Sequence, residues 1–337
     1  MKILYLLPVP SQARYQKRVY SLAEQGAESC VMAFERDYYQ GKPWKDGYIK
    51  LGEINHQSYL ERIIPLIKAI RIIREELETS DVIYVFGLDM LLLAVVSRLF
   101  QNFNQKIVYE VGDLRDIQLS KGILSVLTRI VERWLLDHID HLVVTSPGFI
   151  EGYYKKLIDL DQLPHQIIEN KVMPGWLPTA DVEKNRNGKN MIIGYYGLLR
   201  DTRSWTILKQ IVEQGNGHIG VYLRGIPMGL PTFFEDVQRS DFLQYQGEYV
   251  YPDELSEIHK NADIIWACYP FQESVLGNWN YARTNRFYEA CFFKTPIISQ
   301  SGTLDSQAVD KYQIGLSLDL GEIEESINKV LSLDDQN

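Results

Sequence analysis

The 337-residue chain contains little cysteine, no long apolar run and no excess of positive charge. Its three cysteines, Cys30, Cys268 and Cys291, are far apart and form no C-x-x-C pair, so the sequence predicts neither a disulfide framework nor a zinc site. No apolar run approaches the roughly 18 residues that a membrane-spanning helix needs. Residues 1–7 are apolar but stop at Pro8, which predicts a buried first strand rather than a signal peptide. We therefore expect a cytoplasmic protein, soluble or peripheral to the membrane.

The formal net charge of −9 is distributed unevenly along the chain. Residues 1–175 carry 21 Lys and Arg against 22 Asp and Glu, so most of the acidic excess, 14 against 22, lies in the remaining residues. A net negative chain argues against general nucleic-acid binding, which requires a basic face. A nearly neutral first half fits a domain that faces an anionic lipid or another anionic surface.

Strand-like and helix-like segments alternate along the chain, which predicts an α/β fold with parallel sheets. The opening, residues 1–34, is Rossmann-like but lacks the G-x-G-x-x-G fingerprint of dinucleotide binding. The same pattern restarts at residue 191, after a segment rich in proline, glycine and polar residues. The sequence therefore predicts an N-terminal domain over 1–172, a linker over 173–190 and a C-terminal domain over 191–337.

Two predicted helices combine apolar residues with basic ones, over residues 59–78 and 122–138. A basic amphipathic helix lies on an anionic membrane surface in some proteins. The alternative, which we favour at this point, is a helix that covers a sheet and keeps its charged face in solvent.

Thr284 and Asn285 precede a short apolar helix and are typical N-cap residues. The N-terminus of a helix binds anions, above all phosphate. Glu289 follows one turn later, where a carboxylate accepts hydrogen bonds from sugar hydroxyls. This spacing predicts a site for a nucleoside diphosphate, with phosphate at the cap and ribose at Glu289. The plainer alternative is a capped helix whose glutamate only offsets the helix dipole.

A second candidate phosphate-binding segment, a glycine loop, starts at Gly197, after the first strand of the C-terminal domain. Glycine permits close backbone approach, and the guanidinium groups of Arg200 and Arg203 suit a diphosphate. Another strand is expected to end in a glycine turn at Gly225. In the N-terminal domain, Asp89, Glu110 and Asp113 lie at the carboxyl ends of predicted strands, where parallel sheets bind ligands.

Residues 285–290, N-R-F-Y-E-A, and 294–299, K-T-P-I-I-S, resemble the signature of retaining nucleotide-sugar glycosyltransferases of GT-B fold, family 4. Many members build bacterial surface polysaccharides. The resemblance implies two Rossmann-like domains that face each other across a cleft, with the donor held by the C-terminal domain. It also places Arg14 near that cleft. Two solvated cations at a helix start, Arg14 and Lys17, are the equally simple alternative.

The chain departs from the family pattern at several positions. The family's first conserved glutamate falls on Tyr281, and its usual histidine near the reacting sugar is replaced by Gly112. Asp113 keeps the acidic position and becomes the candidate acceptor-side base. The resemblance also aligns Arg203 with a family lysine that neutralises the leaving diphosphate. It makes Tyr249 a contact of the nucleotide base.

The sequence thus predicts a metal-independent retaining glycosyltransferase without a cofactor, which uses a nucleotide-diphosphate sugar and a glycan or lipid-linked acceptor. The alternatives are a nucleotide-sugar hydrolase or epimerase of the same fold, and a non-catalytic sugar-nucleotide-binding partner of another transferase. The predicted catalytic residues are Asp113, Arg203 and Glu289. The predicted donor-binding residues are Gly197, Arg200, Arg203, Gly225, Tyr249, Tyr281, Thr284, Asn285 and Glu289. The predicted acceptor-side residues are Arg14, Asp89, Glu110 and Asp113.

Overall fold

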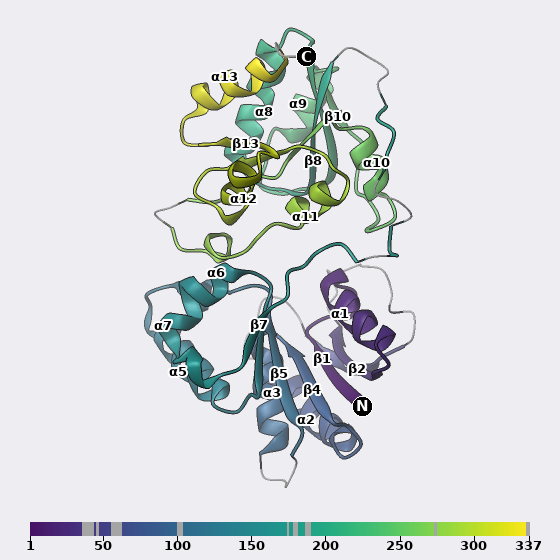
Figure 1. The fold of residues 1–337 in the computed structure, drawn as a ribbon, viewed down its shortest axis with the longest axis vertical. Coiled ribbons are helices and arrows are strands. Elements are labelled where there is room, and N and C mark those ends of the chain that lie inside the picture. The colour runs from purple at the N-terminus through teal and green to yellow at the C-terminus, as the bar shows by residue number, and fades with distance from the viewer. Residues whose placement is uncertain are drawn as a thin grey trace. The chain divides into compact units, whose positions relative to one another are not determined.

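The computed structural model describes residues 1–35, 44, 47–54, 63–99, 104–173, 175–177, 181–185, 190–272 and 275–334. The start of the helix expected over 59–78 and parts of the linker expected over 173–190 lie outside the described residues. The chain divides into two compact units, Met1–Glu169 and Asn170–Asn337. Each unit is built on its own parallel sheet (Figure 1), as the alternating sequence pattern predicts.

The first unit contains seven parallel strands in the order β3-β2-β1-β4-β5-β6-β7. Tyr5 lies opposite Val31 on one side and Tyr84 on the other, so β1 is central and buried. The strand order reverses between β1 and β4, and such a switch point is where α/β sheets form ligand crevices. The strands are β1 (Lys2–Leu7), β2 (Glu28–Glu35), β3 (Ile49–Glu53), β4 (Val82–Phe86), β5 (Lys106–Val111), β6 (His141–Val144) and β7 (His165–Ile167).

Helices connect these strands, and a π-helical turn, η1 (Ile150–Tyr154), interrupts the segment after β6. None of the helices in the part of the chain that the structure describes is long and apolar enough to cross a bilayer. The helices are α1 (Ala13–Glu24), α2 (Ile63–Leu77), α3 (Leu88–Arg98), α4 (Asp116–Leu119), α5 (Ile123–Leu136), α6 (Pro147–Phe149) and α7 (Lys155–Leu157), with a 3-10 turn η2 (Leu160–Gln162).

The second unit contains six parallel strands in the order β10-β9-β8-β11-β12-β13, with the switch point between β8 and β11. The strands are β8 (Met191–Leu199), β9 (Ile219–Pro227), β10 (Leu243–Tyr245), β11 (Ile264–Trp266), β12 (Ile297–Gln300) and β13 (Gly315–Leu318). The helices are α8 (Thr202–Gln214), α9 (Phe233–Arg239), α10 (Leu255–Lys260), α11 (Asn285–Phe292), α12 (Leu304–Tyr312) and α13 (Ile323–Asp334), with a 3-10 turn η3 (Asn278–Asn280).

Apolar side chains cover both faces of this second sheet. Neighbouring strand residues point to opposite faces, so Tyr195 packs in one core cluster and Tyr196 in the other. Trp266 belongs to the first cluster and Ile265 to the second. Because both faces are buried, the strands are nearly continuous apolar runs, which made them recognisable in the sequence.

The glycine turns expected at Gly197 and Gly225 are wrong. Both residues lie inside strands, directly opposite each other in the β8–β9 register. Each has a positive φ, +96° and +119°, so the two strands bend where their backbones meet without ending there. β10 ends at Tyr245, so Tyr249 lies in the loop that follows this strand.

Candidate functional site

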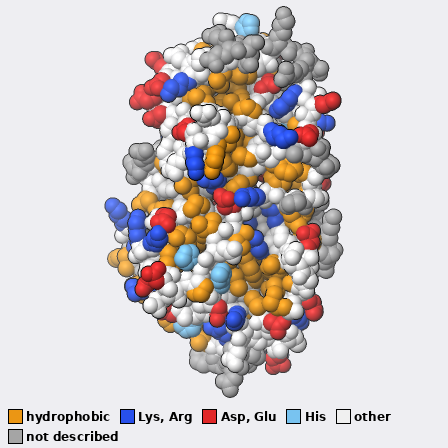
Figure 2. All heavy atoms as spheres, viewed as in Figure 1, with side chains coloured by type: hydrophobic (Ala, Val, Ile, Leu, Met, Phe, Trp, Pro, Cys, Tyr) orange, Lys and Arg blue, Asp and Glu red, His pale blue; other side chains and the backbone are white. Residues whose placement is uncertain are grey.

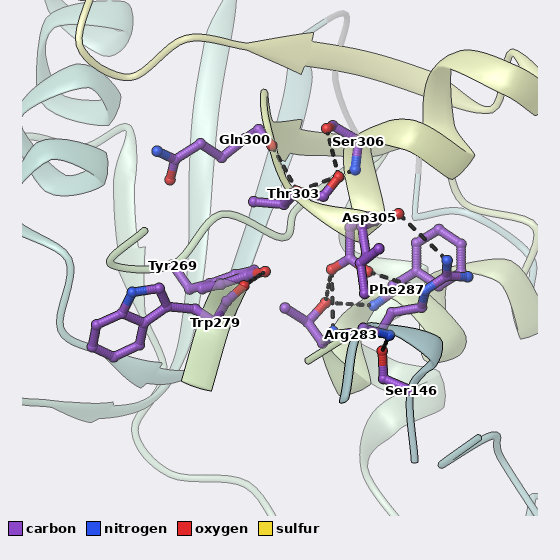
Figure 3. Close-up of polar contacts among 12 residues, drawn as sticks. Ser146, Tyr269, Trp279, Arg283, Phe287, Gln300, Thr303, Asp305 and Ser306 are labelled. Atoms are coloured by element: carbon purple, nitrogen blue, oxygen red, sulfur yellow. Dashed lines mark hydrogen bonds and ion pairs between the residues drawn. The ribbon is translucent and has the colours of Figure 1, made fainter. Parts of the chain in front are cut away.

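The N-terminus of α11 lies beyond the carboxyl ends of the second sheet's strands and is built around Thr284 and Asp305. The Thr284 hydroxyl accepts a hydrogen bond from the Phe287 N–H at 3.1 Å, which makes Thr284 the N-cap. Its hydroxyl and its own N–H donate to one oxygen of Asp305, at 2.7 and 3.1 Å (Figure 3). Burial raises the pKa of Asp305 to about 6, against the opposing effect of these hydrogen bonds and of Arg283.

Arginine side chains surround this helix start. The Arg283 guanidinium lies 3.7 Å from Asp305 and stacks over the Phe287 ring, 4.7 Å from its centroid. Arg286 donates to the carbonyls of Trp266 and Cys268, both at 3.0 Å. These contacts concentrate positive charge at the positive end of the helix dipole.

Two backbone donors at this helix start remain available. Among the described residues, none accepts a hydrogen bond from the N–H of Asn285 or Arg286. The Asn285 side chain instead accepts one from Asn170, at 2.8 Å. A helix N-terminus with open N–H groups and nearby guanidinium groups has the chemistry that binds phosphate.

The structure brings four predicted donor residues into one cluster beside this helix. Glu289 is buried, 4% exposed, and accepts a hydrogen bond from the Tyr196 hydroxyl at 2.9 Å. The rings of Tyr196 and Tyr249 meet edge to face, 5.9 Å apart. The Tyr249 hydroxyl lies 4.0 Å from the point where a Cβ on Gly197 would stand. Gly225 is the register partner of Gly197, so both glycines belong to this cluster.

Only glycine fits at the strand crossing inside the cluster. A Cβ added to Gly225 would overlap the carbonyl oxygen of Gly197. The φ of +119° at Gly225 also lies in a region that side chains disfavour. The glycines therefore let two backbones approach closely inside strands, where the sequence indicated loops.

A buried hydrogen-bonded chain runs inward from Glu289. The Tyr196 hydroxyl also lies 3.3 Å from Nε2 of His259, whose Nδ1 is 3.0 Å from the Thr295 hydroxyl. Burial, together with Lys184, lowers the pKa of His259 to about 3, so the imidazole is neutral. Burial and then Glu289 raise the pKa of Tyr196 well above its ordinary value. The chain thus holds Tyr196 as a hydrogen-bond donor to Glu289.

Arg203 lies near the start of α8 and points to a backbone carbonyl. Its Nη2 donates to the Phe271 carbonyl at 2.6 Å, and Gln300 donates to the same oxygen at 2.9 Å. Its Nε lies 3.5 Å from Asp201, the N-cap of α8. Within the described chain, no residue accepts from Nη1, which leaves one donor edge available.

Two predicted donor residues stand apart from these contacts. Arg200 is exposed at the end of β8 and takes part in none of the ion pairs found among the described residues. Tyr281 is 9% exposed, and burial raises the pKa of its hydroxyl. Its backbone N–H closes the η3 turn on Asn278, at 3.0 Å.

The first unit contains a cavity of about 260 Å³ at the carboxyl ends of β1, β4 and β5, beside its switch point. Arg14, Glu110 and Asp113 line it, together with Gly112 and Arg115. Three of the four predicted acceptor-side residues therefore share one pocket.

The fourth acceptor-side residue, Asp89, is linked to the pocket through a cation. Both oxygens of Asp89 accept hydrogen bonds from Arg115, at 2.9 and 2.8 Å. Asp113 is more open, with 56% of its side chain exposed, and pairs with Arg14 at 2.8 Å. Asp113 is thus the pocket carboxylate that a substrate reaches most easily.

Glu110 is the most constrained of the pocket carboxylates. Both of its oxygens accept hydrogen bonds from Arg18, at 2.7 and 3.1 Å, and the Tyr84 hydroxyl donates at 2.5 Å. Its side chain is fully buried. Glu110 therefore fixes α1 against β5 through Arg18, which is a structural task in addition to any contact with ligand.

Sequence reasoning missed several residues of these sites. Arg283 and Arg286 were part of the motif that the sequence showed, but nothing in it indicated which carbonyls or carboxylates they meet. Asp305 and Gln300 lie on later elements, and no local pattern connects them with Thr284 or Arg203. His259 had no signal at all, because a single histidine in a short helix is most often a packed core residue.

No family model matches the chain. The chain is 29% identical over 340 residues to the succinoglycan biosynthesis protein ExoL of Rhizobium meliloti (strain 1021). That match covers 96% of this chain and 82% of the relative.

Solved structures of similar fold extend along almost the whole chain. The lipopolysaccharide outer core galactosyltransferase WaaB superposes with a TM-score of 0.67 at 15% identity, over 100% of this chain and 91% of that chain. Anabaena Alr3699/HepE in complex with UDP superposes with a TM-score of 0.70 at 14% identity, over 100% and 90%. Identities this low show the fold alone. The chain has the GT-B fold.

Proposed function

We propose that the protein is a retaining, metal-independent glycosyltransferase that moves a sugar from a nucleotide-diphosphate sugar to a glycan or lipid-linked acceptor. The observation that carries the proposal is the α11 start, where two open backbone N–H groups lie one turn before the buried Glu289. This arrangement places phosphate donors and a carboxylate that can accept hydroxyl hydrogen bonds on one helix, one turn apart.

The proposed roles follow from the contacts in the second unit. The open N–H groups of Asn285 and Arg286 bind the diphosphate, and the Nη1 edge of Arg203 neutralises it as it leaves. Glu289, oriented by Tyr196, accepts the ribose hydroxyls. Tyr249, whose hydroxyl lies near Gly197, contacts the nucleotide base. Fixed donors of this kind stabilise developing negative charge without reorganising during the reaction.

In the proposed reaction, the bond between the anomeric carbon and the diphosphate oxygen breaks, and its electron pair leaves with the nucleoside diphosphate. The acceptor hydroxyl forms the new bond on the same face of the sugar. Its proton passes to Asp113, the exposed carboxylate of the first unit's pocket. No enzyme nucleophile is assigned.

Nucleotide binding tests the donor site directly. Because HepE is known as a complex with UDP, UDP is the first ligand for a thermal-shift screen, with GDP, dTDP and CMP beside it. A ligand that binds the folded state raises its apparent stability. We expect one of these nucleotides to raise the melting temperature of the protein.

We also expect Arg203→Gln to lower the rate of sugar transfer about 10²-fold, which is the effect of losing one oxyanion donor.

Arg239→Gln is the matched control, since Arg239 lies in the same unit, is 75% exposed and pairs only with Glu235 among the residues described. It should bind nucleotide and transfer sugar as the wild type does. Unchanged transfer in Arg203→Gln would overturn the assignment of the leaving-group site. Failure of all four nucleotides to bind would overturn the donor site itself.

Incubation with donor alone separates transfer from hydrolysis or epimerisation. A transferase should release free sugar slowly without acceptor, because its acceptor hydroxyl is missing. Rapid release of free sugar, or appearance of an epimer, would favour a hydrolase or epimerase of the same fold. Nucleotide binding without any turnover would favour a non-catalytic partner of another transferase.

We also propose that the first unit contacts an anionic membrane surface through α5. The outer face of this helix is apolar: Ile123, Leu124, Leu127, Ile130, Val131 and Trp134 are 82, 69, 52, 59, 43 and 42% exposed. Figure 2 shows that apolar side chains reach the protein surface beside Lys and Arg side chains on the face in view. The exposure of α5 departs from the packed, sheet-covering helix that we favoured from sequence.

The charges beside this face select an anionic partner. Lys121 and Arg133 are exposed, and the one carboxylate within α5, Glu132, is fully buried. An apolar face with basic neighbours and no exposed carboxylate of its own complements anionic lipid. We expect co-sedimentation with vesicles that contain phosphatidylglycerol and little with phosphatidylcholine alone.

Replacement of one apolar residue tests the membrane contact. Ile130→Glu should remove vesicle binding, whereas Val275→Glu, a change of an exposed apolar residue in the second unit, should not. A dimer in solution that Ile130→Glu dissociates would instead assign the face to a second copy of the chain and overturn the membrane proposal.

A further inference from the structure

Gly112 has an unusual neighbour in the pocket of the first unit. A Cβ added at this position would overlap Nη1 of Arg14, and Cζ and Nε lie almost as near. The Arg14 guanidinium therefore occupies the space that a side chain at position 112 would fill. The glycine that replaces a histidine in the family resemblance is what admits this cation to the pocket.

The Arg14 guanidinium is held in place but not saturated. Its Nη2 donates to Asp113 at 2.8 Å, and its side chain is 14% exposed. Its Nε is buried, and among the described residues no acceptor bonds to Nε or Nη1. Glu110, the other carboxylate beside it, has both oxygens engaged by Arg18 and Tyr84.

Two helix N-termini add positive potential to the same pocket. Gln12, the N-cap of α1, and Gly87, the N-cap of α3, both line the cavity. Neither helix start has a side-chain cap; α1 has no acidic residue in its first turn, and the one in the first turn of α3, Asp89, is paired with Arg115. The positive ends of two helix dipoles therefore lie beside the cation. The cavity of about 260 Å³ is large enough for one sugar-sized group.

We propose that this pocket binds an acidic group of the acceptor, a carboxylate or a phosphate, on Arg14, and that Gly112 is the residue that makes this possible. The inference rests on the proposed transferase function and gives its acceptor a chemical class. The oxyanion replaces Asp113 on the guanidinium. Asp113 is then released from its ion pair and is available to take the proton of the acceptor hydroxyl.

Binding of three monosaccharides to the full chain tests the proposal: glucuronate supplies a carboxylate, glucose 1-phosphate a phosphate, and glucose neither. Ligand-observed NMR titration gives the dissociation constant of each without requiring turnover. We expect at least one of the two anions to bind about tenfold or more tightly than glucose, as a charge-assisted hydrogen bond predicts. The two anions also tell a glycan carboxylate from a phosphate-bearing acceptor.

Variants assign the binding to the residues named. Arg14→Gln and Gly112→Ala should each weaken anion binding about tenfold, the first by removing the cation and the second by displacing it. Asp113→Asn should bind the anion more tightly than the wild type, because a competing carboxylate is gone. Arg71→Gln removes a cation of the same unit that is 90% exposed and should change nothing.

Three results would overturn the inference. They are equal binding of glucose and both anions, unchanged anion binding in Arg14→Gln, and loss of anion binding in Asp113→Asn. Nucleotide binding is measured on the same samples, and far-UV circular dichroism with thermal unfolding shows whether the first unit of each variant is folded. If any of these three results is found while the wild type still binds nucleotide, only this inference is rejected. Loss of nucleotide binding in the wild type rejects the function on which it rests.

Discussion

His259 makes the stability of the second unit depend on pH in a way that one substitution isolates. The side chain is fully buried, and its pKa falls from the usual 6.5 to about 3. Below pH 6.5 the unfolded chain binds a proton that the folded chain does not bind. The resulting stability is therefore fully present above pH 6.5 and is lost as the pH falls toward 3.

The size of the effect follows from these two pKa values. Between pH 8 and pH 4.5, protonation of His259 in the unfolded state alone lowers the free energy of unfolding by about 3 kcal/mol. The value changes little if the folded pKa is one unit higher, because pH 4.5 still lies above it. Asp305, whose pKa is raised to about 6, contributes with the opposite sign between pH 6 and 3.8, but equally in wild type and variant.

The measurement compares wild type with His259→Gln by urea unfolding at pH 8 and pH 4.5. Replacing Trp44 and Trp134 by Phe leaves tryptophans only in the second unit, so that fluorescence reports its unfolding. The wild type should lose about 3 kcal/mol more than the variant between the two pH values. A difference that stays within about 0.5 kcal/mol would refute the buried, neutral imidazole and the hydrogen-bonded chain that leads to Glu289.

Two further changes test the packing beneath the sites. Gly225→Ala should lower the free energy of unfolding by about 2 kcal/mol or more and weaken nucleotide binding, because its Cβ overlaps the Gly197 carbonyl at a positive φ. Gly122→Ala, where the added methyl meets open space, should cost less than about 1 kcal/mol by urea unfolding, the loss of a glycine at the N-cap of α5. Glu110→Gln should cost about 3–5 kcal/mol, because it leaves the largely buried Arg18 without its anion. Glu151→Gln removes an exposed pair and should shift the unfolding free energy by less than about 0.5 kcal/mol, and a similar loss in both variants would contradict the burial argument.

The fold was predictable because its signals are local and repeated. Buried parallel strands appear as short apolar runs, and residues 1–7 and 191–196 stand out in this way without knowledge of their partners. Thr284 was recognisable as a helix cap for the same reason, since the hydroxyl bonds to a backbone group three residues later. The predicted domain boundary stays a prediction.

The site was less predictable because its contacts join distant segments. The glycines at 197 and 225 looked like loop residues. Only the strand register shows that they are partners in adjacent strands, where a side chain on Gly225 would overlap Gly197. Arg14 and Gly112 are 98 positions apart, and no periodicity connects them. Asp89, Glu110 and Asp113 were each placed correctly at strand ends by pattern, but the arginine that each one meets came only from the packing. Their roles in binding and catalysis remain predictions.

The buried Glu132 has a consequence for how α5 is oriented. Its carboxylate accepts hydrogen bonds from Gln118, Tyr153 and Tyr154, which belong to α4 and η1 on either side of the helix in sequence. Without such a constraint, the hydrophobic effect would favour rotation of the apolar face of α5 toward the protein interior. Glu132 opposes this rotation, because turning the helix would break the hydrogen bonds from all three partners and leave a buried carboxylate unsatisfied. Glu132→Leu would add apolar surface to the interior, but it would also remove the hydrogen bonds that keep the apolar face of α5 exposed.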